Sequence, residues 1–185
     1  DMSREHVGSR ISLPGAQSKI GLAHMPGSPM SQGWLKPRGL AASTHILKTG
    51  SIEKLVGLEF LCMRAAKKCG VKVPEVTLLD FGKPVLAVER FDRVVTIDEE
   101  GLRVERIHQE DFAQAFGMTS ASKYVELPNG SIASIAQWIR SYDAKPTEDL
   151  SQFAKAVCFN YLIGNCDAHL KNISIMYRVG KRGPI

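Results

Sequence analysis

The front half of the chain alternates short apolar runs with breaks rich in Gly and Pro, a pattern typical of strands joined by loops. The strands that these runs predict lie at 10–13, 19–23, 45–48, 75–80 and 84–91. A long connection is expected from 25 to 38, where three Pro and two Gly interrupt the sequence. This half is therefore expected to consist mainly of strands.

One helix is predicted in this half, from about Glu53 to Gly70. Five of its residues recur at steps of three or four, which is the spacing of one face of a helix. These residues are Leu55, Leu58, Cys62, Ala65 and Cys69. We expect this face to be buried, and we expect the helix to stop at Gly70, since Gly is common just past a helix end.

Helical spacing dominates the rear half. The helices that it predicts lie at 110–116, 131–140 and 148–163, after a hairpin-like piece at 98–106 and before a strand at 173–177. The last helix is expected to bury one face made of Leu150, Phe153, Val157, Tyr161 and Leu162. A strand-rich part at 1–93 and a helical part at 94–185 predict a two-lobed α+β protein, with small ligands expected between the lobes.

Composition and charge narrow the class of protein. The 185 residues are enough for one domain or two small lobes, and 44% apolar residues argue against disorder. The chain has 24 Lys and Arg against 19 Asp and Glu, and the resulting net charge of +5 favours anionic partners. No apolar run reaches the ~18 residues of a membrane span, and no secretory signal is expected. Four Cys without C-x-x-C spacing argue against zinc and fit a reducing cytoplasm.

The most informative polar stretch is the loop 164–172. Within it, Asp167 and Asn172 have the D-x-x-x-x-N spacing of a protein-kinase catalytic loop. Such a loop needs a carboxylate to take the proton of the acceptor hydroxyl and an oxygen ligand for Mg²⁺, and Lys171 would stabilise charge on the moving phosphoryl group. The alternative is that Asp and Asn only cap and turn the chain, which is common for both.

A second candidate is Lys48, at the end of a predicted strand and just ahead of the helix. The kinase lysine that contacts the nucleotide phosphates occupies such a place. Glu53 or Glu59 could pair with it, and Glu59 is favoured because an acid in the first helical turn is already explained by the helix dipole. The alternative is a lysine at a sheet edge whose ammonium group only reaches into water.

A turn between two predicted strands is a third candidate. It contains Gly15, Ala16 and Gln17, whose backbone N–H groups could bind phosphates. Its single glycine matches neither G-x-G-x-x-G nor the Walker pattern, so a plain hairpin is favoured for this segment taken alone.

The run 88–93, where the two parts join, is a fourth candidate. Its backbone could hydrogen-bond an adenine edge, and Asp92 could reach a ribose hydroxyl. The alternative is a charged linker with Phe91 packed against the protein. Because these segments occur in the order that kinases use, together they favour phosphoryl transfer from a nucleotide.

A series of ordered motifs then carries a resemblance over most of the chain. The motifs are SLPGAQSK at 12–19, THILK at 44–48, EFLCM at 59–63, VP at 73–74, AVERFDR at 87–93, HQED at 108–111, KY at 123–124 and LIGNCDAHLKN at 162–172. With them, the chain resembles the HipA family of bacterial serine/threonine kinases, the toxins of HipBA-type toxin–antitoxin pairs. This resemblance implies a two-lobed protein-kinase-like α+β fold, protein kinase activity, and ATP and Mg²⁺ as cofactors.

The resemblance also implies a role for each matching residue. By position, Asp167 would be the catalytic base and Asn172 a Mg²⁺ ligand. The residues that would contact ATP are Lys48 at the phosphates, Gly15, Ala16 and Gln17 in the phosphate loop, Glu89 and Phe91 through their backbone at the adenine, and Asp92 near the ribose. Ser12 matches the serine that these kinases autophosphorylate, which in the family holds the phosphate loop away from ATP.

The partners that the resemblance implies are a HipB-like DNA-binding antitoxin, operator DNA through that complex, and an aminoacyl-tRNA synthetase as protein substrate. Family members carry a further metal-binding aspartate downstream of the Asn, whereas no Asp or Glu follows Asp167 here, and they usually have an extra N-terminal subdomain. We therefore expect an incomplete chain. Two other functions stay open, a catalytically impaired kinase-like scaffold that binds an antitoxin or DNA, and a small-molecule kinase.

Overall fold

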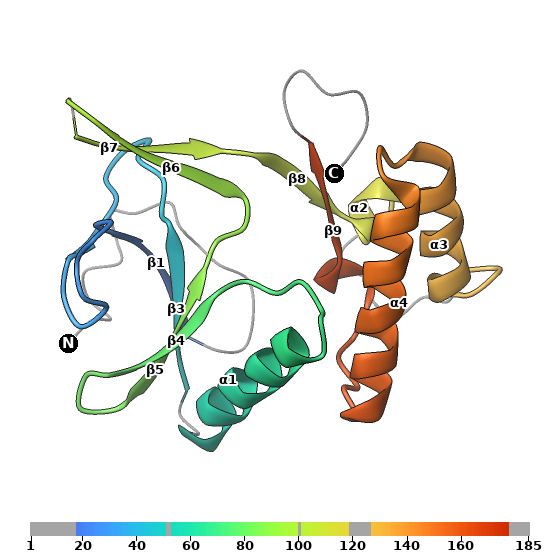
Figure 1. Cartoon of the computed structure of the whole chain (residues 1–185), viewed down its shortest axis with the longest axis horizontal. Coiled ribbons are helices and arrows are strands. Elements are labelled where there is room, and N and C mark those ends of the chain that lie inside the picture. Colours follow the sequence, from blue (N-terminus) through green and yellow to red (C-terminus); the bar gives the residue numbers. More distant parts are fainter. Residues whose placement is uncertain (1–17, 51–52, 100, 119–126, 178–185) are drawn as a thin grey trace. The chain divides into compact units, whose positions relative to one another are not determined.

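The computed structural model describes residues 18–50, 53–99, 101–118 and 127–177 of the chain (Figure 1). Contacts divide it into two compact units, Asp1–Ala65 with Val73–Arg106 and Ala66–Lys72 with Ile107–Ile185. Each unit is described by itself below, and the division predicted at 93/94 stays a prediction. The predicted strand at 10–13 lies outside the described residues.

The first unit is built on a five-stranded antiparallel sheet in the order β2-β1-β3-β5-β4. Its strands are β1 (Ser18–His24), β2 (Trp34–Leu35), β3 (His45–Thr49), β4 (Val76–Asp80) and β5 (Pro84–Glu89). Four of the predicted strands are thus confirmed, although β5 ends two residues early. The two-residue β2 lies within the segment 25–38, which was expected to be a long connection. It forms a strand because its backbone pairs with the end of β1.

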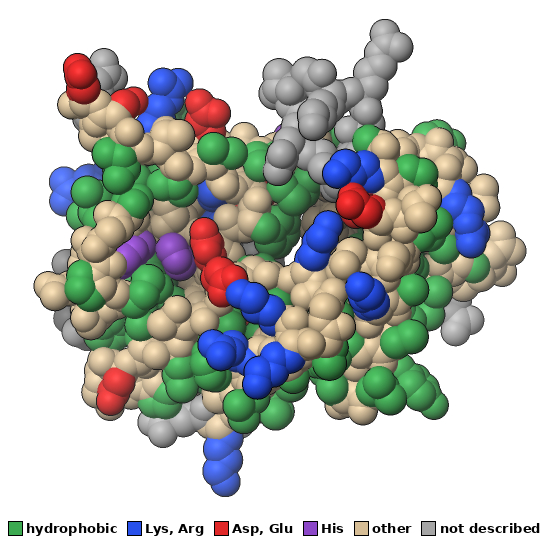
Figure 2. All heavy atoms as spheres, in the orientation of Figure 1, with side chains coloured by type: hydrophobic (Ala, Val, Ile, Leu, Met, Phe, Trp, Pro, Cys, Tyr) green, Lys and Arg blue, Asp and Glu red, His purple; other side chains and the backbone are tan. Residues whose placement is uncertain are grey.

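The helix predicted in this unit forms as α1 (Glu53–Lys68), but the face predicted to be buried is wrong. Leu55 and Leu58 are 50% and 57% exposed, whereas Val56 is fully buried against Val76 and Leu86 of the sheet. The helix carries apolar residues on two faces at the same spacing, and only contact with the sheet decides which face is covered. Hydrophobic side chains that reach the surface are visible as green spheres in Figure 2.

A two-stranded hairpin, β6 (Arg93–Asp98) and β7 (Gly101–Arg106), completes the first unit. The hairpin is longer than the hairpin-like piece expected at 98–106, since β6 already begins at Arg93, shortly after β5 ends at Glu89. Arg93 and Arg106 are register partners at its base. The hairpin therefore brings two arginines side by side.

The second unit joins a small sheet to helices. Its elements are β8 (His108–Asp111), α2 (Phe112–Ala115), α3 (Ser131–Tyr142), α4 (Pro146–Leu162), the 3₁₀ helix η3 (Leu170–Asn172) and β9 (Ser174–Tyr177). The segment predicted as one helix at 110–116 begins as a strand, because β8 pairs with β9 before Asp111 caps the short α2. The other predicted helices and the strand are confirmed within a few residues.

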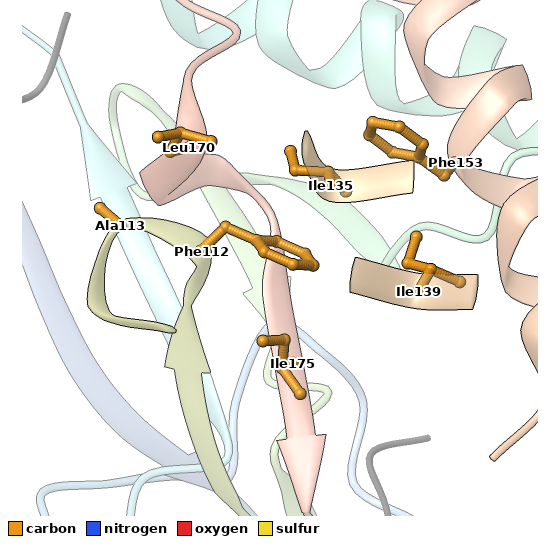
Figure 3. Close-up of a cluster of buried hydrophobic side chains, with 7 residues drawn as sticks. All are labelled: Phe112, Ala113, Ile135, Ile139, Phe153, Leu170 and Ile175. Carbon is orange, nitrogen blue, oxygen red and sulfur yellow. The ribbon is translucent and has the colours of Figure 1, made fainter. Parts of the chain in front are cut away.

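One hydrophobic cluster holds this unit together (Figure 3). Its buried members are Phe112, Ala113, Ile135, Ile139, Phe153, Leu170 and Ile175. Leu150 and Val157 of α4 pack on it as predicted, but Tyr161 and Leu162 are 86% and 80% exposed, because the last turn of α4 runs past the cluster. Leu170 fixes the end of the polar loop 164–172 to this core. No helix in the described part of the chain is long and apolar enough to cross a membrane.

Candidate active site

The polar loop of the second unit brings the two predicted catalytic-loop residues together. The side-chain Nδ2 of Asn172 donates a hydrogen bond to the backbone carbonyl of Asp167, which closes the D-x-x-x-x-N segment on itself. The backbone N–H of Asp167 donates to Asn165 Oδ1 at 3.1 Å, and Asn165 Nδ2 donates to Asn160 Oδ1 at the end of α4. The carboxylate of Asp167 is 71% exposed. It is therefore accessible while its backbone is held on both sides.

His169 is the main residue of this loop to which the sequence analysis gave no role. Its side chain is only 10% exposed, and its Nε2 lies 3.4 Å from Asp167 Oδ1. Its other ring nitrogen, Nδ1, accepts a hydrogen bond from the backbone N–H of Lys171 at 3.3 Å. Since Nδ1 is an acceptor, a neutral ring carries its proton on Nε2, the nitrogen that lies beside Asp167. A histidine two residues after the aspartate was the sequence signal for this contact.

The donor set of the loop suits a hard cation. Because Asn172 Nδ2 points to the Asp167 carbonyl, its Oδ1 points the other way, and amide and carboxylate oxygens are the ligands that Mg²⁺ prefers. Among the residues that the structure describes, no group of three or more His, Cys, Asp and Glu could hold a metal. The loop thus fits one part of a magnesium site and does not complete it.

In the first unit, Lys48 forms an ion pair with Glu59 of α1. Lys48 is the register partner of Leu86 across β3 and β5, so the two side chains share one face of the sheet. Leu86 packs against Val56, which places α1 over that face. Glu59 lies three residues after Val56 on the helix, so the packing that buries Val56 carries Glu59 towards the lysine.

The junction after β5 contains a buried carboxylate. Asp92 is 4% exposed and accepts hydrogen bonds from Arg90 and Arg93. Burial by itself would raise the pKa of Asp92, but hydrogen bonds and charge from the two arginines outweigh it and lower the pKa. The backbone N–H of Glu89 donates to Glu75 O at 2.9 Å, and Phe91 is 49% exposed rather than packed down.

An aromatic cluster at the far end of β1 was not anticipated. His24 is 7% exposed, and its Nε2 lies 3.0 Å from the carbonyl oxygen of Gln32, so it closes the loop between β1 and β2. Trp34 packs against His24 and His45, with ring centroids 4.6 and 5.2 Å away. Burial, and next the charge of His24, lower the pKa of His45 from 6.5 to about 4.

Several predicted site residues have no described position. Ser12, Gly15, Ala16 and Gln17 lie outside the described residues. Lys48 belongs to the first unit and Asp167 to the second, so their predicted convergence on one nucleotide stays a prediction. The backbone N–H of Lys171 binds His169, and the role predicted for its ammonium group likewise stays a prediction.

Comparisons with known proteins add independent information. The HipA-like C-terminal domain family model matches residues 11–184. A protein of Sinorhizobium fredii named "Putative kinase Y4mE" is 38% identical over 174 residues, which cover 92% of this chain and 39% of that protein. The serine/threonine-protein kinase toxin HipA of Shewanella oneidensis is 34% identical over 180 residues, which cover 89% of this chain and 39% of that protein.

A solved structure of the Shewanella oneidensis MR-1 complex of HipA, HipB and operator DNA also matches. The TM-score is 0.78 at 32% identity, over 95% of this chain and 42% of that chain. The match confirms the predicted HipA-like α+β fold. The chain spans 39% of the length of each of the two curated relatives named above. A family match over nearly the whole chain leaves a plain conclusion: the chain belongs to the HipA-like C-terminal domain family.

Proposed function

We propose that the protein containing this chain is an ATP- and Mg²⁺-dependent protein serine/threonine kinase. The observation that carries this proposal is the closed loop in which Asn172 holds the backbone of Asp167 while the carboxylate stays exposed. Relatives of the chain are named as kinases, which supports the same reaction class.

The loop residues divide the chemistry among them. Asp167 accepts the proton of the attacking hydroxyl. The His169 ring, whose Nε2 lies 3.4 Å from Asp167 Oδ1, would restrict the rotamers of that carboxylate. Asn172 would hold Mg²⁺ through Oδ1, and the ion would supply positive charge against the phosphate oxygens during transfer. The ammonium group of Lys171 would add to that charge.

In this proposal, residues of the first unit bind the nucleotide. Lys48 would bind the α/β-phosphates, and Glu59 holds its ammonium group on the sheet face that α1 covers. The backbone of Gly15, Ala16 and Gln17 would bind phosphate oxygens. Since the Glu89 N–H is already bonded to Glu75, an adenine contact at Glu89 would use its carbonyl oxygen, next to the backbone of Phe91.

Regulation and partners follow the family. Ser12 would be autophosphorylated and would then withdraw the phosphate loop from ATP. The Shewanella oneidensis neighbour is a complex with HipB and operator DNA, which supports a HipB-like antitoxin and DNA as partners of this protein. The protein substrate would be an aminoacyl-tRNA synthetase.

The test is transfer of labelled γ-phosphate from ATP by the protein at its natural length. Asp167→Asn is expected to lower the rate by about 10²-fold or more, because the general base is lost while the shape of the loop is kept. Asp98→Asn makes the same change at an exposed aspartate of β6 and should leave the rate unaltered. Transfer to metabolites but not to proteins would favour a small-molecule kinase, and ATP binding without turnover would favour a scaffold.

A further inference from the structure

Three arginines of the first unit bind one run of backbone, residues 40–44, of which 42–44 are buried and Leu40 and Ala41 are exposed. Arg106 donates through Nη2 to the carbonyl oxygens of Leu40 and Ala41 at 3.0 and 3.3 Å. Arg93 donates through Nε to the carbonyl of Ser43 at 3.0 Å. The third, Arg90, approaches the hydroxyl of Ser43 and also pairs its own backbone N–H with the carbonyl of Thr44 at 2.8 Å. Ser43 and Thr44 are 4% and 3% exposed.

One carboxylate neutralises the centre of this arrangement. Asp92 Oδ1 accepts from Arg90 Nε at 3.0 Å, and Oδ2 accepts from Arg90 Nη2 at 2.8 Å and from Arg93 Nη1 at 2.5 Å. Arg90 therefore binds the Asp92 carboxylate as a bidentate salt bridge, which is a strong geometry for an arginine. Both oxygens of Asp92 are thus engaged by arginines, and 4% of the residue is exposed, so these contacts serve to hold Arg90 and Arg93.

The run 40–44 leads directly into β3, the strand that bears Lys48. β3 is paired with β5 in a register that sets Lys48 opposite Leu86 and His45 opposite Glu89. The Arg90–Thr44 backbone bond continues that ladder by one step, at the point where Asp92 anchors Arg90. If residues 40–44 shifted along the sheet, β3 would shift with them, and Lys48 would move relative to β5.

We propose that Arg90, Asp92, Arg93 and Arg106 form an arginine clamp that fixes the start of β3 and thereby positions Lys48 for the nucleotide. Asp92 is in this view a positioning residue that acts through Lys48 and makes no contact with the ribose. The part of the proposal that concerns nucleotide affinity rests on the proposed function. The part that concerns the strand stands on the first unit alone.

The experiment is a double-mutant cycle on ATP affinity in the protein at its natural length, measured well below the melting temperature of each variant. Asp92→Asn removes the central charge and keeps the shape, and Lys48→Ala removes the group said to be positioned. Glu99→Gln, which removes a negative charge from the exposed tip of the β6–β7 hairpin, is the control. Should Asp92→Asn fail to fold, Arg93→Lys replaces it, since lysine keeps the charge but cannot bind Ser43 and Asp92 together.

The clamp predicts that Asp92→Asn weakens ATP binding at least about tenfold in the native background and by less than about twofold beside Lys48→Ala. The same factor should apply to 2′,3′-dideoxy-ATP, which lacks the ribose hydroxyls. Equal losses in both backgrounds, an unchanged affinity, or a loss confined to ATP would overturn the proposal. A loss of affinity confined to ATP would indicate that Asp92 contacts the ribose hydroxyls.

A second measurement separates this proposal from the proposed function. If the native protein binds no ATP, the proposed function fails, and the clamp is then judged by hydrogen exchange of the β3 amides. Asp92→Asn should speed their exchange at least about tenfold relative to Glu99→Gln, since strand opening is set by local contacts. Equal exchange in the two variants would reject the clamp.

Discussion

The imidazole of His169 joins the carboxylate of Asp167 to the backbone of the same loop, with Nε2 3.4 Å from Asp167 Oδ1 and Nδ1 3.3 Å from the Lys171 nitrogen. The ring thus accepts a backbone hydrogen bond through Nδ1, while its Nε2 lies beside the carboxylate. We expect this arrangement to restrict the orientation of the Asp167 carboxylate. An exposed aspartate without such a neighbour would sample several rotamers, and only some of them would face an acceptor hydroxyl.

The first prediction concerns this histidine. His169→Phe keeps much of the ring volume but removes both nitrogens, so kcat for phosphoryl transfer should fall about tenfold or more with little change in KM for ATP. His108→Phe, at an exposed histidine that packs against Tyr177, is the matched control. Steady-state kinetics with labelled ATP measure both values. A rise in KM at constant kcat would mean that His169 does not orient Asp167.

The second prediction concerns the partner of Lys48. Glu59→Gln leaves the ammonium group without its ionised neighbour, so affinity for ATP should fall about tenfold. Glu105→Gln breaks another ion pair, that with Arg103, whose side chains are 61% and 68% exposed. That pair should matter little, as exposed pairs contribute at most ~1 kcal/mol. Equal losses of ATP affinity in the two variants would speak against a positioning role for Glu59.

The third prediction is a dependence of stability on pH. The folded-state pKa of His45, about 4, lies below its usual value of 6.5, so the folded protein favours the neutral ring. The contribution is complete above pH 6.5 and is lost as the pH falls from 6.5 towards 4. His45→Phe should flatten the melting temperature across this window. An unchanged slope between pH 6.5 and 4 in that variant would place the acid sensitivity elsewhere.

The fourth prediction is a stabilising substitution. Burial, and next the charge of Asp143, raise the pKa of Asp149, so its ionised form is penalised in the folded protein. Stability is then lost as the pH rises through the folded pKa, and Asp149→Asn should raise the melting temperature at pH 7. The gain should be at most about 2 °C, because solvent screens a partly buried group. The gain should vanish near pH 3, where the carboxyl is protonated in both states. Glu148→Gln, at the exposed neighbour that pairs with Lys145, should give no such gain.

The sequence predicted most elements of the fold because strands and helices differ in the spacing of apolar residues. It failed for α1, where Leu55 and Val56 begin two apolar stripes of equal spacing and only the sheet decides between them. It failed at 110–116 because the strand at Glu110 depends on pairing with Ile175, 65 positions later. Long-range pairing of this kind leaves no local signal.

The candidate site divides in the same way. Asp167 and Asn172 could be chosen as candidates because their spacing is fixed within one loop, and Lys48 because it ends an apolar run. Their roles stay predictions. The clamp was not found, since Arg106 and the carbonyl of Leu40 lie 66 residues apart and backbone carbonyls carry no sequence signature. The motif at 87–93 suggested a ribose contact for Asp92, which stays a prediction, but it gave no sign of the hydrogen bonds that Asp92 accepts from Arg90 and Arg93.

The most direct measurement is a crystal structure of the protein at its natural length with Mg²⁺ and a non-hydrolysable ATP analogue. The account predicts that the ammonium group of Lys48 contacts the α/β-phosphates while the carboxylate of Asp167 faces the γ-phosphate across space for an acceptor hydroxyl. A bound nucleotide that touches Lys48 with Asp167 turned away from it, or a nucleotide bound elsewhere, would contradict the account.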